Sequence, residues 1–551
     1  MDPTIKVIEH NEAFDQYNEP TFVLKKDIWN DYSYRTQYHL YLQGSPADKT
    51  EDTFIGTVKI LFIGQTGDGK SFIHSDFQKL PENAVSVGQS LDYYQRLSVL
   101  QPHIRDSILI ALNDVAFDSK RKRDFDHLEG WRHSLFRYLP AIDDYLTTAN
   151  AVLTRNYTAI PVTGFKFTFH PADWEEPILF DFTSAPSLLP FPPNVHPLPS
   201  RIITLIGRNG SGKSTLLARL ARVAHGTTKN RELGIFNKLG TIEPISIGFP
   251  RIITVSYSAF DNFTLPGVKP SSEEEPDERV QIVHDTNSGS GRFIFCGLRD
   301  IATELSNEIN EEKNINFDPS GDKSAHTLLK PVTTLAKEFA ATLVLAKRNG
   351  SAEMLDRALA LLVRDPSFPL IANTLSVDLL LQMNPKELFM SWSTGHKIVM
   401  QILVSLAANV TQGTLVLIDE PETHLHPPLL AALMHAIRLI LSYKNAFSII
   451  ATHSPVVIQE TLSKHVYRIK REGSLTNAFP TNTQTFGENV GALTTEIFGL
   501  NTQATDFHKV LDSLIDSNKT LENIEMLFLP HGLSMQARAY VMSKLAMRLQ
   551  P

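Results

Sequence analysis

Cysteine is almost absent from this sequence: Cys296 is the only one among 551 residues. A single cysteine excludes a framework of intramolecular disulfides, which small secreted domains use, and it fits a reducing compartment. We therefore expect Cys296 to be a small packed side chain.

The chain also lacks long apolar runs and a secretory leader. The best candidate for a membrane span, residues 429–441, is interrupted by His435 and Arg438 and is shorter than a bilayer requires. The first residues, MDPTIKVIEHNE, have neither the basic start nor the apolar stretch of a signal peptide. We expect a cytoplasmic protein with no membrane partner.

Net positive charge is missing as well, because the formal charge is −8 at pH 7. Nucleic acid would then be contacted indirectly or through a local basic patch, of which the strongest is the run KRKR at residues 120–123. The composition, with 42% hydrophobic and 20% charged residues, is that of an ordinary globular protein. The length predicts two or three structural units.

The clearest positive feature is residues 201–222, RIITLIGRNGSGKSTLLARLAR. The apolar run at 202–206 predicts a buried parallel strand, and the leucines that follow recur at helical spacing. The turn between them matches the phosphate-binding pattern G-x-x-x-x-G-K-[ST]. The predicted ATP-binding residues are Gly207, Arg208, Asn209, Gly210, Ser211, Gly212, Lys213, Ser214 and Thr215. Lys213 would reach the β and γ phosphates, and the Ser214 hydroxyl would bind Mg²⁺.

A second stretch, residues 64–71 (GQTGDGKS), fits the same pattern. The residues after it alternate like a strand and meet Pro81, so the helix that would hold a phosphate is missing. We therefore predict a β-hairpin with a Gly/Asp turn here.

Three further motifs follow a helix-rich stretch at residues 298–385. WSTGHK (392–397) precedes an apolar helix, LVLIDEP (415–421) is a strand that ends in two carboxylates, and FSIIATHS (447–454) is a strand that ends in a histidine. Asp419, at the end of a buried strand beside the P-loop strand, would hold Mg²⁺. Glu420 would polarise the attacking water, and His453 would hydrogen-bond the γ-phosphate.

In this order, GRNGSGKST, WSTGHK, LIDEPETHLHP and ATHSP resemble the Walker A, signature, Walker B with D-loop, and H-switch motifs of an ABC-type ATPase head. DEPETHLHP is similar to the branch that contains OLD-family and RecF-like ATPases. The resemblance implies ATP and Mg²⁺ as cofactors. It also implies that two copies close face to face, so that Ser393, Thr394 and Gly395 of one copy cap the ATP held by Lys213 of the other.

Other stretches, among them SVGQSLDYYQRL, SYSAFDNF and TFGENVGALTTEIFGL, resemble the PtuA-type ATPase of Septu and retron-associated antiphage systems. That resemblance implies a slowly hydrolysing sensor or scaffold that works with a small HNH nuclease of the PtuB type. In the retron form, a reverse transcriptase with its RNA–DNA hybrid (msDNA) joins the assembly.

The sequence departs from the ABC pattern in two places. The signature has Trp392, Thr394 and His396 at positions where other residues are usual. The Q-loop glutamine is absent, and its role would fall to Ser256, Ser258 or Asp261, or be missing.

The expected fold is α/β: an ABC-type ATPase head of the P-loop NTPase class, with a β-rich N-terminal lobe and a helical insertion between Walker A and the signature. The expected divisions are residues 1–263 (first part of the head, with the lobe and Walker A), 264–388 (helical insertion), 389–500 (second part of the head) and 501–551 (helical extension).

Two alternatives are open. An OLD-type ATP-dependent nuclease would need an acidic cluster after residue 500, where only scattered acids occur: Asp506, Asp512, Asp516, Glu522 and Glu525. A RecF-like DNA-repair ATPase would need a broad basic surface, which the net charge does not favour. The H-x-H pair His424 and His426 lacks the further ligands of a zinc site and is better explained as part of the D-loop.

Overall fold

The computed structural model describes residues 4–15, 19–44, 52–160, 165–183, 198–269, 276–310, 321–324, 327–363, 365, 368, 375–473, 475–498, 506–517 and 519–548. The chain forms two compact units, Met1–Phe486 and Gly487–Pro551. Each is described by itself.

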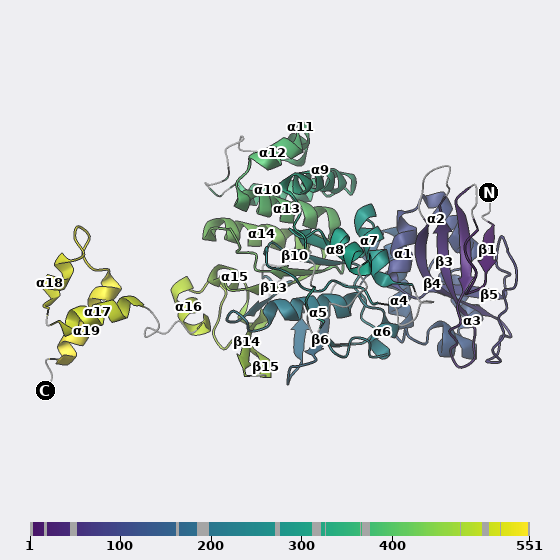
Figure 1. Cartoon of the computed structure of the whole chain (residues 1–551), viewed down its shortest axis with the longest axis horizontal. Helices are drawn as coiled ribbons and strands as arrows, with labels where there is room; N and C mark the ends of the chain where they lie inside the picture. Colours follow the sequence, from purple (N-terminus) through teal and green to yellow (C-terminus); the bar gives the residue numbers. More distant parts are fainter. Residues whose placement is uncertain are drawn as a thin grey trace, which may run out of the picture. The chain divides into compact units, whose positions relative to one another are not determined.

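The first unit is built around a seven-stranded sheet in the order β11-β10-β12-β13-β8-β14-β15 (Figure 1). Its strands are β8 (Ile202–Ile206), β10 (Ile252–Ser256), β11 (Phe293–Gly297), β12 (Leu415–Asp419), β13 (Phe447–Thr452), β14 (Val466–Glu472) and β15 (Leu475–Pro480). All neighbouring pairs are parallel except β14 and β15. The predicted α/β class with a parallel sheet is confirmed.

Helices cover both faces of this sheet, which explains why its central strands are continuous apolar runs. The core on one face includes α13 (Thr394–Asn409), α14 (Pro427–Lys444) and α15 (Pro455–Gln459), together with α9 (Val332–Arg348) and α10 (Ala352–Leu362). Helices α11 (Val377–Gln382) and α12 (Pro385–Ser391) pack on α9 and extend the same core. The other face packs against α5 (Lys213–His225), α7 (Glu278–Ser288), α8 (Ile301–Asn310) and the small sheet of β6 (Lys166–Pro171), β7 (Ile178–Asp181) and β9 (Gly240–Glu243). The short α6 (Thr228–Glu232) follows α5.

The N-terminal lobe has its own five-stranded sheet and its own core. The sheet contains β1 (Ile5–Ile8), β2 (Thr21–Lys26), β3 (Gln37–Gln43), β4 (Thr53–Phe62) and β5 (Ala84–Gly88) in sequence order. The lobe's helices are α1 (Leu91–Val99), α2 (Pro102–Ala111), α3 (Lys122–Phe125) and α4 (Ile142–Thr154). The expected β-rich lobe therefore folds around a core separate from that of the large sheet.

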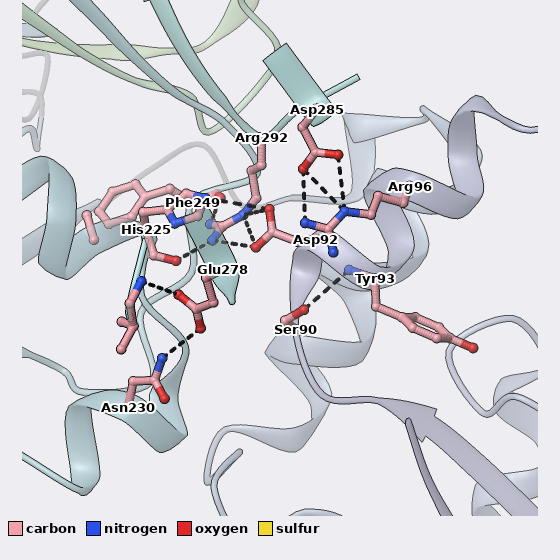
Figure 2. Close-up of polar contacts among 12 residues, drawn as sticks. Ser90, Asp92, Tyr93, Arg96, His225, Asn230, Phe249, Glu278, Asp285 and Arg292 are labelled. Carbon is pink, nitrogen blue, oxygen red and sulfur yellow. Dashed lines mark hydrogen bonds and ion pairs between the residues drawn. The ribbon is translucent and has the colours of Figure 1, made fainter. Parts of the chain in front are cut away.

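Two buried ion pairs join helix α1 of the lobe to α7 and to the residue that precedes β11 (Figure 2). In one pair α1 supplies the carboxylate, and in the other it supplies the guanidinium. Asp92 of α1 accepts from Arg292, with an Nη2–Oδ2 distance of 3.1 Å, and Arg96 donates to Asp285, with an Nη2–Oδ2 distance of 3.0 Å. The same Arg292 donates to the carbonyl of His225, at the end of α5. Burial alone would raise the pKa of Asp92, but Arg292 and the other neighbouring cations lower it well below its usual range. One guanidinium thus holds both α1 and the end of the P-loop helix.

Replacing Asp92 by asparagine is expected to destabilise the first unit by about 3–5 kcal/mol, because it leaves the buried Arg292 without its counter-charge. Equilibrium denaturation followed by tryptophan fluorescence measures this. Glu82→Gln, which removes an ion pair between Arg121 and a carboxylate side chain that is 74% exposed, is the matched control and should leave the transition unchanged. Equal losses in both variants would contradict a special role for the buried pair.

Residues 64–71 do not form the predicted hairpin turn. Strands β4 and β5 do pair in antiparallel fashion, but the connection between them runs from residue 63 to residue 83 and is an irregular loop. The predicted strand after Ser71 is also wrong, since Phe77 makes only an isolated bridge to Ile5. No helix follows the glycines in this described stretch, and the Lys70 side chain is 77% exposed beside Asp68.

The predicted divisions need two changes. Residues 264–388 are not purely helical, because β11 pairs with β10 along its whole length and forms the edge of the large sheet. The second unit starts near Gly487 rather than at residue 501. It contains α16 (Val490–Phe498), α17 (Asp506–Asp516), α18 (Leu521–Met526) and α19 (Met535–Arg548), with a small core of Leu511, Ile515, Ile524 and Val541.

Across the described residues, no helix is both long and apolar enough to cross a membrane. The cysteine is buried, where its sulfur lies 3.4 Å from the Tyr257 hydroxyl.

Candidate nucleotide site

The predicted Walker A, Walker B and H-switch motifs meet at one edge of the large sheet. Gly207 follows directly on β8, His453 on β13 and Glu420 on β12, and these parallel strands are neighbours with β13 in the middle. The expectation that the Asp419 strand lies beside the P-loop strand is therefore wrong. The intervening β13 brings His453 between the two Walker motifs. Ligands of open parallel sheets bind at this carboxyl edge.

The P-loop backbone has the form that a phosphate requires. Gly210 and Gly212 have φ of 76° and 97°, in the left-handed region that favours glycine. Helix α5 starts without a side-chain cap, so its first N–H groups are not satisfied by a neighbouring side chain. The Ser211 hydroxyl is buried and has no hydrogen-bond partner within the described structure. A phosphate would satisfy these donors, so the loop fits a nucleotide.

Gly207 is required for close packing rather than for its dihedral angles. A Cβ atom there would lie 2.6 Å from the carbonyl oxygen of Ile469 in β14 and 2.6 Å from the Ser211 hydroxyl. The P-loop is thus fitted against the next strand of the sheet. Arg208, Asn209 and Gly210 are exposed, whereas Thr215 is half-buried in α5.

Lys213, His453 and Glu420 form a continuous polar chain. The Lys213 amine donates to the carbonyls of Gly207 (3.1 Å) and Arg208 (3.3 Å) and lies 2.9 Å from His453 Nε2. The same Nε2 lies 3.0 Å from Glu420 Oε1. It can therefore accept from Lys213 when unprotonated or donate to Glu420 when protonated. Burial lowers the pKa of Lys213, while the hydrogen bond from His453 lowers that of Glu420. Glu420 is thereby kept as a carboxylate, the form that a general base needs.

Glu420 itself has a φ of 47°, which non-glycine residues rarely adopt. Its N–H still donates to the Ala451 carbonyl at 2.9 Å, so the strand pairing continues to this residue. Glu420 therefore combines a left-handed backbone with a carboxylate that contacts His453.

The candidate metal-binding pair is also assembled. The Ser214 hydroxyl donates to Asp419 Oδ1 at 2.9 Å. Burial raises the pKa of Asp419 to about 7, and the charges of Glu420 and Asp261 add to the rise. A bound cation would favour the ionised carboxylate. Hydroxyl and carboxylate oxygens are ligands that suit Mg²⁺, which supplies charge neutralisation for phosphates when bound.

The three residues suggested as substitutes for the Q-loop glutamine, Ser256, Ser258 and Asp261, do not all lie at the same place in the structure. Ser256 and Asp261 line a cavity of about 50 Å³ together with Ser214 and Asp419. The Ser256 hydroxyl is buried without a hydrogen-bond partner among the described residues. Ser258 does not line this cavity; its hydroxyl instead accepts from the N–H of Phe260. Ser256 and Asp261 are thus the candidates that reach the metal site.

The predicted signature residues lie at the start of α13. They follow the P-loop at a long distance along the chain and belong to a different element. Ser393 caps the helix and contacts His396 Nδ1 at 2.8 Å. Ser393 and Thr394 are exposed, and Gly395 leaves room for the D-loop, since a Cβ atom there would lie 3.0 Å from the His424 carbonyl. The unusual Trp392 is a core residue, 5% exposed, whose ring packs edge-on against Phe339.

One residue of the site was not anticipated. Glu422 accepts from the Thr452 hydroxyl at 2.8 Å and from the backbone N–H of His453 at 2.6 Å. It fixes the end of β13 and therefore the position of the histidine. The sequence gives no signal for this role beyond its place in DEPET, because the contact depends on β12 and β13 being neighbours.

His426 has a local structural role. It accepts from the N–H of Leu429 and so caps α14. Its Nε2 lies 3.8 Å from Asp365.

Comparison with known proteins agrees with this geometry. Residues 290–459 match the family described as "AAA domain, putative AbiEii toxin, Type IV TA system". This range contains the predicted signature, Walker B and H-switch positions, while the P-loop precedes it. This match and the motifs at the sheet edge indicate an ATPase-type P-loop protein. ATPases of this class use a nucleotide, typically with Mg²⁺.

Among curated proteins, the chain is similar to Protein ea59 of Escherichia phage lambda, with 29% identity over 533 residues, covering 94% of this chain and 92% of that protein. Among solved structures, it is similar to the SMC head domain from Thermotoga maritima, with 12% identity, a TM-score of 0.26 and coverage of 58% of this chain and all of that chain. UvrA2 from Deinococcus radiodurans matches at 14% identity with a TM-score of 0.23, covering 58% of this chain and 38% of that one.

Proposed function

We propose that this chain is an ATP-controlled switch whose heads close face to face around ATP and which governs a nuclease carried by a separate protein. The part of this proposal that concerns ATP hydrolysis rests on the polar chain from Lys213 through His453 to Glu420, next to the Ser214–Asp419 pair. These groups provide a phosphate cradle, a metal-binding pair and a candidate base at one sheet edge.

The face-to-face arrangement rests on the signature. Ser393 and Thr394 are exposed at the N-terminus of α13, and within the chain they belong to a different element from the P-loop. Exposed N–H groups at a helix start favour an anion. A second copy would bring the γ-phosphate of its bound ATP to them, which would give the polar, exposed signature beside the buried Trp392 a function.

The partner is proposed to be a small HNH nuclease of the PtuB type within an antiphage complex. A reverse transcriptase with its msDNA would be an additional member in a retron-type system. The resemblance of the sequence to PtuA-type ATPases supports this proposal. Closing and opening of the heads would be the motion that the nuclease follows.

The structure offers little support for the alternative of an OLD-type nuclease. Three carboxylates that follow residue 500 are engaged by neighbours within their own unit: Asp512 by Tyr540, Asp516 by Arg548 and Glu525 by Arg538. Such pairing leaves them poorly placed to share a divalent cation.

The decisive experiment incubates the purified chain with plasmid and single-stranded DNA in Mg²⁺ or Mn²⁺, with and without an HNH partner. We expect no cleavage by the chain alone, and cleavage with the partner that depends on the nucleotide present. Robust cleavage by this chain alone, lost in Asp512→Asn or Glu525→Gln, would instead assign the nuclease to the second unit.

A further inference from the structure

The hairpin formed by β14 and β15 differs in charge from the rest of the molecule. Between residues 463 and 486 the chain has four Lys or Arg side chains and one acidic side chain, Glu472, although the whole protein has a net charge of −8. The cations are Lys464, Arg468, Lys470 and Arg471. This segment is therefore a local positive region on an acidic protein.

These cations are not neutralised by neighbouring carboxylates. In the part of the chain that the structure describes, none of the four forms an ion pair; Lys464 contacts the Thr183 carbonyl and Arg471 the Gly473 carbonyl. Lys464, Lys470 and Arg471 are exposed. An unpaired exposed cation keeps its full attraction for a phosphate.

The basic run at residues 120–123, which the sequence marks as the strongest patch, is different. Arg121 lies 3.1 Å from Glu82 and 3.5 Å from Asp118, and Lys122 lies 2.5 Å from Asp143. Half of that run is therefore already paired. The hairpin is the better site for an anionic polymer.

An aromatic ring accompanies the hairpin cations. Phe479 of β15 lies directly opposite Arg468 of β14, and the Lys470 amine is 6.0 Å from the centre of its ring. The ring is 47% exposed, and Phe486, seven residues further on, is 39% exposed. Large aromatic side chains normally bury most of their surface, so a half-exposed ring between cations is available for stacking.

The hairpin also lies next to the nucleotide site. β14 pairs with β8 through Arg468, and its next residue, Ile469, contacts Gly207 closely enough to exclude a Cβ atom. β14 and β15 form one edge of the large sheet, as Figure 1 shows. A polymer on this hairpin would therefore lie beside the P-loop.

We propose that the β14–β15 hairpin binds single-stranded nucleic acid, with phosphates on Arg468 and Lys470, which share a face of the hairpin with Phe479, and a base stacked on Phe479. Cations with an exposed ring are the combination by which proteins bind unpaired strands without reading sequence. In a duplex the faces of internal bases are stacked on one another, so Phe479 would have no partner there.

The test is fluorescence anisotropy with labelled oligothymidylate of about 20 nucleotides and a duplex of equal length. The double variant Arg468→Glu and Lys470→Glu should bind the single strand at least about tenfold more weakly and show a shallower dependence on salt. Phe479→Ala should reduce the affinity for the single strand about 5- to 100-fold and reduce the affinity for the duplex much less. A variant with the same charge change on α9, Lys337→Glu and Arg348→Glu, should bind like the unaltered protein.

Each variant is also assayed for ATP binding, which reports an intact first unit. Failure of the unaltered protein to bind oligothymidylate would overturn the proposal, as would equal losses in the hairpin and α9 variants. Equal competition by polyglutamate would identify a general anion surface and would overturn it too. These outcomes are independent of the partner nuclease.

Discussion

Replacing Lys213 by alanine is expected to weaken ATP binding by at least about 100-fold, the effect of losing charge-assisted hydrogen bonds worth roughly 3 kcal/mol. Lys213 is 4% exposed, and its amine lies among the P-loop carbonyls and His453. No other lysine is placed within the P-loop to replace it. Equilibrium binding of a labelled ATP analogue measures the loss.

Lys70→Ala is the matched control, because Lys70 occupies the same position of an identical sequence pattern. Its side chain is 77% exposed, and the loop around it is not followed by a helix. We expect unchanged ATP affinity. A Lys70 defect as large as that of Lys213 would show that residues 64–71 bind the nucleotide, contrary to the structure.

Replacing Glu420 by glutamine is expected to slow hydrolysis by roughly 10²- to 10⁴-fold, the range for losing a general base. The amide keeps the size of the side chain but cannot accept a proton from water. ATP should therefore stay bound, and the closed dimer should accumulate. Single-turnover hydrolysis and light scattering with and without ATP give the two readouts.

Adding Ser393→Arg to the Glu420→Gln variant separates closure from hydrolysis. A large cation at the exposed start of α13 should block the dimer while a single head still binds ATP. If the combined variant dimerises with ATP as Glu420→Gln alone does, the signature face is not the contact between copies.

The candidate phosphate and metal residues could be proposed from sequence because each depends on a local pattern. The P-loop lies between its own strand and helix, and Asp419 directly follows a run of four apolar residues. The order of the strands has no such local signal. It places β13 between β8 and β12, and this is what brings Lys213, His453 and Glu420 together.

Strand β11 was missed for a related reason. FIFCG is a short apolar run of five residues, flanked by polar stretches, and periodicity cannot distinguish such a run from a piece of buried helix. Only its pairing with β10 identifies it as a strand. The ion pairs of α1 are still harder to predict from sequence, since Asp92 and Arg292 are 200 positions apart and Arg96 and Asp285 are 189 positions apart.

The shared guanidinium of Arg292 has a consequence for how this protein can be divided or recombined. A shortened chain that begins after residue 160 would retain Arg292 and Asp285 but lose both counter-charges, so two charged groups buried in the full chain would lose their partners. A lobe taken from a relative would fit only if it supplied an acid and a base one helical turn apart, as α1 does with Asp92 and Arg96. The lobe and the ATPase sheet are therefore expected to be inherited together, and exchange between relatives should succeed only when both ion pairs are transferred as a set.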